Sequence, residues 1–336
     1  MMQSVGIIVA NLGSPASPAR KDVAKFLGDF LSDPYVVDLP TPIRQFLARG
    51  IIAIPRSKPS SEAYASIWDS PEGPLRRITS EVAETIQENT GIQTVVGMRY
   101  GQPSIDHALD ELSDCQTIVL AMLYPQHADS TRTTTIRYLQ KVCSDKSIRI
   151  VPVYYQEKEY LNALVRCTKE SIDDDIEQVV ISFHSLPIRH ILKADPTKSH
   201  CLKFAECCDV ESIAHETCYK HQCQMTATHL GNALGLPYSI GYQSRLGRLP
   251  WLEPSTVDVI SHMAKKGVKR IAVTCPAFVV DNLETLEEIG IRARDIFLSL
   301  GGEKLQLLPC LNTDTKWIEF FSRFILQPLK PNEYDK

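Results

Sequence analysis

The sequence predicts an α/β fold with mostly parallel β-sheets, in a chain long enough for two domains. Its 336 residues suit two domains of ordinary size better than one small domain. Short β-branched apolar runs alternate with amphipathic segments, the order expected of parallel sheets with crossover helices. Most runs are apolar at every position, as in strands buried on both faces. A closed eight-stranded barrel fits the number of runs, but their uneven spacing argues against it.

Each element is expected from its local pattern. Strands are expected where short runs are rich in Val and Ile, which favour extended backbone. These runs are Val5–Asn11, Thr94–Met98, Thr117–Leu123, Ile148–Val153, Gln178–Phe183, Tyr238–Gly241, Arg270–Cys275 and Leu305–Leu308. Helices are expected where apolar residues recur at helical spacing. These segments are Lys21–Leu31, Ser80–Glu88, Ile105–Leu112, Ser130–Val142, Gln222–Leu234, Thr256–Lys266, Leu283–Phe297 and Lys316–Ile325.

Two stretches interrupt the alternation. Pro34–Gly73 is rich in proline and serine, and we expect a long functional loop or lid there. Ile188–Thr217 is irregular and carries several cysteines. A boundary is expected within Tyr154–Asp175. The expected organisation is an N-terminal domain over residues 1–160, a C-terminal domain over residues 161–312, and a last helix within residues 313–336 that packs back on the first domain.

Composition and charge exclude several classes of protein. Hydrophobic residues make up 43% and charged residues 23%, which excludes disordered, collagen-like and simple coiled-coil chains. The net charge of −4 gives no reason to expect a nucleic-acid partner. No apolar run approaches the roughly 20 residues that span a bilayer. The start, MMQSVGIIVANLGSP, lacks a basic segment, so we expect no signal peptide and a cytoplasmic location.

The strongest local motif is an apolar strand that ends in a histidine. The expected strand Gln178–Phe183 leads directly into His184, and Pro187 then ends regular structure. In open parallel sheets, ligands bind at the carboxyl ends of strands. From position alone, a functional imidazole and a histidine that only bonds to backbone are equally supported.

An acidic segment follows the expected strand Arg270–Cys275. Asp281 and Glu284 have the spacing of a capping box, and the residues alone favour this structural role. Asp281, Glu284 and Glu288 also recur at i, i+3 and i+7, the spacing of one helical face. Carboxylates aligned in this way repel one another unless they are solvated, share protons or bind a cation.

Other loops at strand ends give weaker signals. The loop after Tyr238–Gly241 carries Arg245 and Trp251, which suit either a flat anionic ligand or a packed loop. Gly97–Tyr100 and Tyr124–Gln126 lie at two further strand ends, and each is weak alone.

Taken together, these segments resemble one family, the ferrochelatases. Its motifs occur in order at Asn11–Pro15, Gly97–Tyr100, Leu123–Gln126, Ser182–Pro187, Tyr242–Arg245, Pro250–Leu252, Asp281–Ile289 and Pro309–Asn312. The resemblance implies two Rossmann-like domains with parallel sheets and a cleft between them. It also implies insertion of ferrous iron into protoporphyrin IX, the final step of haem synthesis, without any nucleotide. A related chelatase for another divalent metal or for coproporphyrin III is the nearest alternative, and a haem or metal carrier without turnover is an alternative of another class.

The resemblance assigns roles to particular residues. His184 and Glu284 are expected to face the centre of the macrocycle from opposite walls, where proton removal and iron delivery are divided between them in an order that stays open. Glu288 and Asp281 are expected to extend a carboxylate path for the metal. Porphyrin contacts are expected from apolar and aromatic walls and from arginines that pair with propionates: Leu12, Tyr100, Trp251, Arg99 and Arg245.

The segment 196–223 departs from simple bacterial relatives through its cysteines. Five cysteines fall within 23 residues, at Cys201, Cys207, Cys208, Cys218 and Cys223. Some ferrochelatases hold a [2Fe–2S] cluster in a C-terminal tail or in an internal insertion, and the tail here, Trp317–Lys336, has no cysteine. The resemblance therefore implies an internal cluster on Cys201, Cys208, Cys218 and Cys223, with Cys207 as a substitute for Cys208. Structural zinc and a set of free thiols are the alternatives.

The expected partners are porphyrin and ferrous iron. An apolar stretch, Ile43–Ile54, is expected either to make peripheral contact with the inner membrane or to form only a pocket wall. The sequence predicts no particular number of subunits.

Overall fold

The chain folds into two compact units in a computed structural model that describes residues 4–327 except 246 and 248. The first unit is made of the described parts of Met1–Tyr124, Asp129–Pro152 and Asn312–Lys336. The second unit is made of Pro125–Ala128 and Val153–Leu311. Apart from Pro125–Ala128, which belongs to the second unit, the chain changes units after residues 152 and 311, compared with 160 and 312 in the expected division.

The first unit is built on a four-stranded parallel sheet in the order β2-β1-β3-β4. Its strands are β1 (Val5–Asn11), β2 (Thr94–Met98), β3 (Thr117–Met122) and β4 (Ser147–Ile150). Every side chain of β2 and β3 is buried, as are all those of β1 after Val5. This burial on both faces explains why these runs are apolar throughout and do not alternate.

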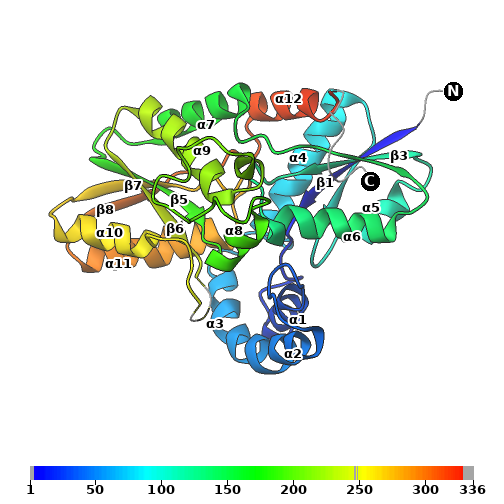
Figure 1. The fold of residues 1–336 in the computed structure, drawn as a ribbon, viewed down its shortest axis with the longest axis horizontal. Helices are drawn as coiled ribbons and strands as arrows, with labels where there is room; N and C mark the ends of the chain where they lie inside the picture. The colour runs from blue at the N-terminus through cyan, green and yellow to red at the C-terminus, as the bar shows by residue number, and fades with distance from the viewer. Residues whose placement is uncertain (1–3, 246, 248, 328–336) are drawn as a thin grey trace. The chain divides into compact units, whose positions relative to one another are not determined.

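Helices cover the first sheet and close the unit. They are α1 (Arg20–Leu31), α4 (Pro74–Thr90), α5 (Ile105–Glu111), the π-helical η2 (Asp129–Thr133), α6 (Thr134–Val142) and α12 (Thr315–Phe324). Asp314 caps α12 by accepting a hydrogen bond of 2.8 Å from the backbone of Trp317. The last helix lies along α4 (Figure 1), and Ser322 accepts a hydrogen bond from Asn89 at its end. The described C-terminal residues thus belong to the first unit.

The stretch Pro34–Gly73, expected to be an irregular loop, is largely helical. It forms α2 (Thr41–Phe46), the π-helical η1 (Leu47–Ile52) and α3 (Ala53–Ala65), and we call these three segments the lip. Both η1 and α3 pack against α1 (Figure 1). The prediction was wrong because proline was read as a helix breaker, whereas Pro42 lies in the first turn of α2, where proline is tolerated, and α3 accommodates Pro59 in its interior.

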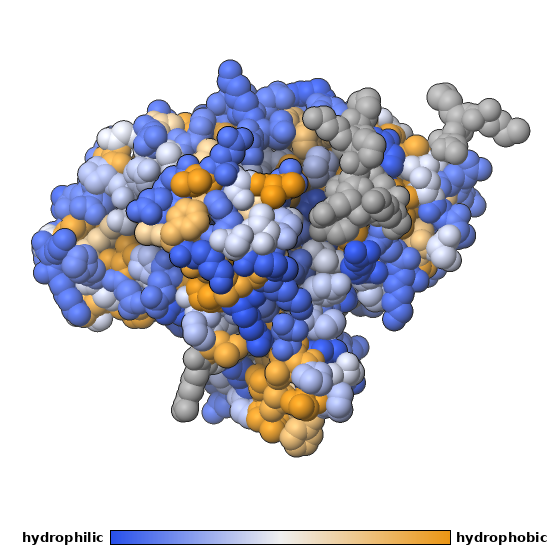
Figure 2. All heavy atoms as spheres, viewed as in Figure 1, coloured by the Kyte–Doolittle hydropathy of each residue, from blue (hydrophilic) through white to orange (hydrophobic). Residues whose placement is uncertain are grey.

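The lip carries an exposed apolar surface. Ile43, Phe46, Ile51 and Ile54 are between 50% and 66% exposed. Figure 2 shows hydrophobic side chains gathered on the face where Figure 1 places α2. A patch of this kind on an otherwise polar surface is typical of a site of contact.

The second unit has its own four-stranded parallel sheet in the order β6-β5-β7-β8. Its strands are β5 (Gln178–His184), β6 (Tyr238–Gln243), β7 (Arg270–Thr274) and β8 (Lys304–Leu307). Alternate side chains of β5 enter different apolar clusters: Val179 and Ile181 one cluster, Val180 the other. Both sheets are parallel and all eight predicted strands are present, so the predicted α/β fold class is confirmed.

The helices of the second unit include three elements that sequence patterns did not predict. The elements are α7 (Lys158–Ser171), α8 (Ile188–Ala194), the 3₁₀ turn η3 (Ile213–Glu216), α9 (Tyr219–Leu234), α10 (Thr256–Lys265), the π-helical η4 (Glu284–Ala293) and α11 (Arg294–Ser299). The unpredicted ones are α7, which lies within the expected boundary region Tyr154–Asp175, and the short elements α8 and η3. Within the described part of the chain, no helix combines the length and the apolarity needed to cross a bilayer.

Candidate functional site

His184 is the last residue of β5, a strand with neighbours on both sides in the second unit's sheet. Its Nδ1 lies 2.6 Å from the carbonyl oxygen of Ser185. A carbonyl only accepts hydrogen bonds, so this contact assigns the proton to Nδ1 and leaves Nε2 as the basic nitrogen. The Tyr219 hydroxyl donates to the backbone carbonyl of His184 at 2.9 Å, and Phe278 packs edge-on against the ring. The imidazole is thus held in one orientation and one tautomer.

The surroundings of His184 favour its neutral form. Burial lowers its pKa below the ordinary value of 6.5, although the nearby charge of Glu288 and the contact with Ser185 act in the opposite direction. A group with this pKa carries no proton on Nε2 at neutral pH. It is therefore able to accept one.

Glu284 begins the π-helix η4, and its side chain takes no part in capping. The expected capping box of Asp281 and Glu284 is wrong, because the reciprocal bonds form one residue later. Asn282 Oδ1 accepts from the Thr285 N–H at 3.1 Å, and Thr285 Oγ1 accepts from the Asn282 N–H at 3.0 Å. The Glu284 carboxylate is left available for chemistry.

Burial sets the protonation of Glu284. Together with the charges of Glu288 and Glu287, it raises the pKa of this carboxyl to about 7, against the opposing effects of the backbone N–H of Glu284 and of Arg292. The backbone of Glu284 is fixed by Gln243, whose Nε2 donates to the Glu284 carbonyl at 2.7 Å. Gln243 is the register partner of His184 across the β5–β6 pair. One buried amide therefore ties the histidine strand to the glutamate helix.

Glu288 lies one π-turn further along η4 and accepts two hydrogen bonds from one residue. The Ser244 N–H donates to Oε1 at 2.8 Å and the Ser244 hydroxyl donates to Oε2 at 2.5 Å. Arg292 approaches the same carboxylate at 4.0 Å, but it bonds more closely to Glu287, at 2.8 Å. Glu288 influences the pKa of both His184 and Glu284, so the three side chains share one region.

Asp281 lies outside this group. It is buried, and it accepts hydrogen bonds from Thr285 Oγ1 at 2.8 Å and from the Cys310 N–H at 3.3 Å. These bonds connect the start of η4 to the segment after β8. Such bonds are typical of a carboxylate with a structural role. A role of Asp281 as a metal ligand stays a prediction, and these contacts do not favour it.

Two predicted porphyrin contacts lie in the loop after β6. Trp251 is partly exposed and forms a bridge with Pro187, in the His184 loop. Arg245 bonds within its own loop, to the Leu252 carbonyl at 3.3 Å and to Glu253 at 3.5 Å. Trp251 is thus placed beside the histidine loop, and the assignment of both residues to porphyrin stays a prediction.

The other predicted porphyrin contacts lie in the first unit. Arg99 pairs with Asp33 at 2.5 Å, and the Tyr100 hydroxyl donates to the same carboxylate at 2.9 Å. Tyr100 is only 5% exposed, so its ring offers little surface to a ligand. Leu12 is partly buried against the apolar core. Binding of porphyrin by these residues stays a prediction, which the contacts of Arg99 and Tyr100 do not favour.

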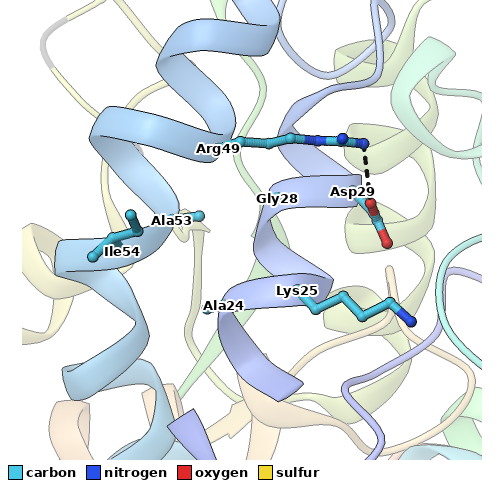
Figure 3. Close-up of a pocket in the computed structure, with 7 residues that line it drawn as sticks. All are labelled: Ala24, Lys25, Gly28, Asp29, Arg49, Ala53 and Ile54. Carbon is cyan, nitrogen blue, oxygen red and sulfur yellow. Dashed lines mark hydrogen bonds and ion pairs between the residues drawn. The ribbon is translucent and has the colours of Figure 1, made fainter. Parts of the chain in front are cut away.

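An open hollow of about 410 Å³ also lies in the first unit, between α1 and the lip (Figure 3). Arg49 reaches across it and pairs with Asp29 at 3.5 Å. Its walls are formed by Ala24, Lys25, Gly28, Asp29, Arg49, Ala53 and Ile54.

All five cysteines of the segment 196–223 are buried and none forms a disulfide. Cys218 interacts with both Cys208 and Cys201, and its contact with Cys208 lowers the pKa of Cys218 to about 6. Cys207 influences the pKa of both Cys201 and Cys208. Cys223 contacts Tyr219 as well as Cys218. We call the four cysteines that influence one another's pKa, namely Cys201, Cys207, Cys208 and Cys218, the thiol group.

Backbone N–H groups also approach this thiol group. The Leu202 N–H donates to the Cys207 sulfur at 3.4 Å, and the backbone of His221 bonds to the Cys218 sulfur. Nevertheless, among the described residues no set of three or more His, Cys, Asp or Glu side chains is arranged as metal ligands would be.

Sequence reasoning identified His184, Glu284 and Glu288 but missed the residues that hold them. Gln243 and Ser244 were part of a recognised motif, yet neither was singled out. Their signal was two polar residues at the end of an apolar strand, next to the strand that carries the histidine.

The fold is that of a chelatase-type protein: a chain with two parallel α/β sheets, in which a neutral histidine ends β5 and two glutamates lie on η4. The chain is similar in fold to a solved structure described as SirB from Bacillus subtilis with Fe3+, with a TM-score of 0.52 and 10% identity over 96% of this chain and 94% of that one. At this identity the likeness concerns the fold alone.

Sequence comparison identifies the family. The ferrochelatase family model matches residues 4–329. The ferrochelatase of Pseudomonas fluorescens (strain Pf0-1) is 43% identical over 94% of this chain and 96% of that protein. The ferrochelatase of Stutzerimonas stutzeri (strain A1501) is 43% identical over 95% and 96%. The chain belongs to the ferrochelatase family. It is a lyase that inserts iron into protoporphyrin IX, the last step of haem biosynthesis, as the sequence motifs predicted.

Proposed function

We propose that His184 and Glu284 accept the two protons that the porphyrin loses, and that Glu288 receives ferrous iron before insertion. The observation that supports this proposal is electrostatic: the charge of Glu288 acts on the pKa of both His184 and Glu284. Iron insertion needs both proton acceptors and an oxygen ligand for the entering cation.

The two acceptors suit this task in different ways. The imidazole is neutral, with its proton on Nδ1, so its Nε2 can take a proton directly. The Glu284 carboxyl, with a pKa of about 7, exchanges its proton near neutral pH, which is the condition for an efficient acid or base. One pyrrole proton passes to Nε2 and the other to the carboxylate. Ferrous iron takes the place of both protons at the ring nitrogens, and the ring skeleton is unchanged.

The test is an anaerobic assay of Fe²⁺ insertion with His184→Ala. We expect kcat to fall by about a hundredfold or more, as for loss of a general base, while porphyrin binding, measured by fluorescence titration, changes little. His229→Ala, on the exposed side of α9, is the matched control and should keep the wild-type rate. A His184→Ala enzyme with an unchanged rate would show that Nε2 accepts no proton in the reaction.

We also propose that the thiol group holds a [2Fe–2S] cluster, with Cys201, Cys207, Cys208 and Cys218 as ligands. Four buried thiols and two N–H groups directed at sulfur are the donor chemistry that such clusters use. Relative to the set expected from the sequence, Cys207 replaces Cys223, because Cys223 also contacts Tyr219. The side chains would have to rotate to converge on a cluster.

The cluster has a test that does not depend on activity. Protein handled without oxygen should be reddish-brown and contain about two irons and two acid-labile sulfides per chain. Cys218→Ser should lose the colour, Cys223→Ser should keep it, and Cys143→Ser in the first unit is the control. Colourless wild-type protein with one zinc per chain would replace the cluster with a structural zinc site.

Finally, we propose that the enzyme works in the cytoplasm and that the lip makes peripheral contact with the inner membrane. Its apolar side chains, which are about half exposed, would each gain up to about 1–2 kcal/mol from leaving water. The double variant Phe46→Ser/Ile51→Ser should reduce flotation with phosphatidylethanolamine–phosphatidylglycerol vesicles by about tenfold or more. Phe204→Ser, at an exposed phenylalanine of the second unit, should not change it. Wild-type protein that fails to float would refute the contact.

A further inference from the structure

Ser244 has a backbone conformation that serine rarely adopts. It follows β6 directly, and its φ is +67°, in the left-handed region. This region costs about 1–2 kcal/mol for a residue with a Cβ atom. A non-glycine residue persists there only when its contacts hold it in place.

Both hydrogen-bonding groups of Ser244 act on Glu288. The backbone N–H bonds to one carboxylate oxygen at 2.8 Å and the hydroxyl to the other at 2.5 Å. Two bonds from one residue to the two oxygens prevent the carboxylate from rotating. The unusual backbone conformation is therefore accompanied by a clamp on the carboxylate of Glu288.

We propose that Ser244 is a positioning residue, which orients Glu288 and thereby sets the affinity of the enzyme for ferrous iron. The inference rests on the proposed role of Glu288. A carboxylate has about four lone-pair sites, so two bonds from Ser244 leave the others free for a cation. Because the clamp fixes their direction, the cation meets a ligand that is already ordered.

The other charged neighbour of Glu288 is a poorer clamp. Arg292 comes no closer than 4.0 Å, its side chain is 60% exposed, and its closer partner is Glu287 at 2.8 Å. Exposed ion pairs of this length contribute little. Of the contacts described around Glu288, those of Ser244 are the ones that fix its orientation.

The experiment measures KM separately for Fe²⁺ and for porphyrin in Ser244→Ala. Loss of a hydrogen bond to a charged group should raise KM for iron about tenfold, with KM for porphyrin within twofold of wild type. Ser244→Gly also removes the hydroxyl, while it relieves the strained φ, so it provides a second test if the alanine variant folds poorly. Ser255→Ala is the matched control. That serine also bonds to a carboxylate, Asp258, but at the start of α10.

Glu288→Gln and the double variant separate the possible outcomes. If the inference holds, Ser244→Ala has no further effect on KM for iron in the Glu288→Gln background, because both changes remove the same interaction. An additive effect, or an unchanged KM in both Ser244 variants while Glu288→Gln raises it, overturns the role of Ser244. An unchanged KM in Glu288→Gln instead overturns the proposed iron ligand, and the inference with it.

Discussion

At the scale of single residues, two glutamates of the candidate site have different surroundings and therefore different properties. Glu284 and Glu288 are both carboxylates of η4, yet the pKa of Glu284 is raised by burial whereas Glu288 accepts two hydrogen bonds from Ser244. The sequence predicted the acidic pair from spacing. It did not predict a role for Ser244, because that serine reaches Glu288 from a backbone conformation with a φ of +67°, which no sequence pattern indicates.

Glu284→Gln should stabilise the protein at alkaline pH. The folded pKa is about 7 against an ordinary 4.5, so both states hold the proton below pH 4.5 and the substitution changes little there. Between pH 4.5 and pH 7 the unfolded chain has ionised this carboxyl while the folded wild type still holds its proton, so the wild type loses up to about 3 kcal/mol of stability across that window. Urea unfolding from pH 5 to pH 8 should show a difference that grows with pH and levels off above 7.

The control for this series is Glu211→Gln, at an exposed glutamate. It should show no such dependence on pH. A stability difference between Glu284→Gln and the wild type that is constant across the range would mean that burial does not perturb this carboxyl.

At the scale of elements, the spacing of apolar residues predicted the position of the acidic helix but not whether it is an α-helix or a π-helix. The acidic helix was expected over Leu283–Phe297 and is present, but its first part, Glu284–Ala293, is π-helical. The difference arises because an i→i+5 bond leaves no distinctive sequence period. The lip was missed for a related reason: proline content was taken as a sign of a loop, without regard to its position in a turn.

Asn282→Ala should destabilise the second unit by about 1–2 kcal/mol, since it removes the side chain that caps the first turn of η4. Urea unfolding followed by circular dichroism would measure the loss. Asn162→Ala, on the exposed side of α7, is the control and should change stability by less than about 0.5 kcal/mol. Equal effects of the two variants would contradict the reciprocal cap.

At the scale of the whole molecule, the order of strands and helices was predictable because it follows from local patterns repeated twice. The membership of each unit was harder to predict. Pro125–Ala128 belongs to the second unit although it follows β3 of the first, and His127 is held there by Gln222 at 2.6 Å. Such long-range pairing depends on tertiary contacts that a single sequence does not display.

Trp317→Ala should test the attachment of the last helix. Trp317 is fully buried in α12 and stacks on Phe321 with ring centroids 4.7 Å apart. Its loss should cost the first unit about 3–5 kcal/mol, seen as faster hydrogen exchange in α12 and α4. Lys316→Ala, an exposed neighbour, should leave exchange unchanged. Faster exchange confined to the second unit would contradict this packing.

The bond from Tyr219 to the carbonyl of His184 joins two regions of different chemistry. Tyr219 is the first residue of α9 and directly follows Cys218. Any event that displaces this thiol, whether oxidation or the binding of a metal, acts within one peptide unit of the anchor that steadies the imidazole. The cysteine-rich segment is thus joined through one side chain to the backbone of His184, so a change at Cys218 can reach the histidine loop without passing through the sheet.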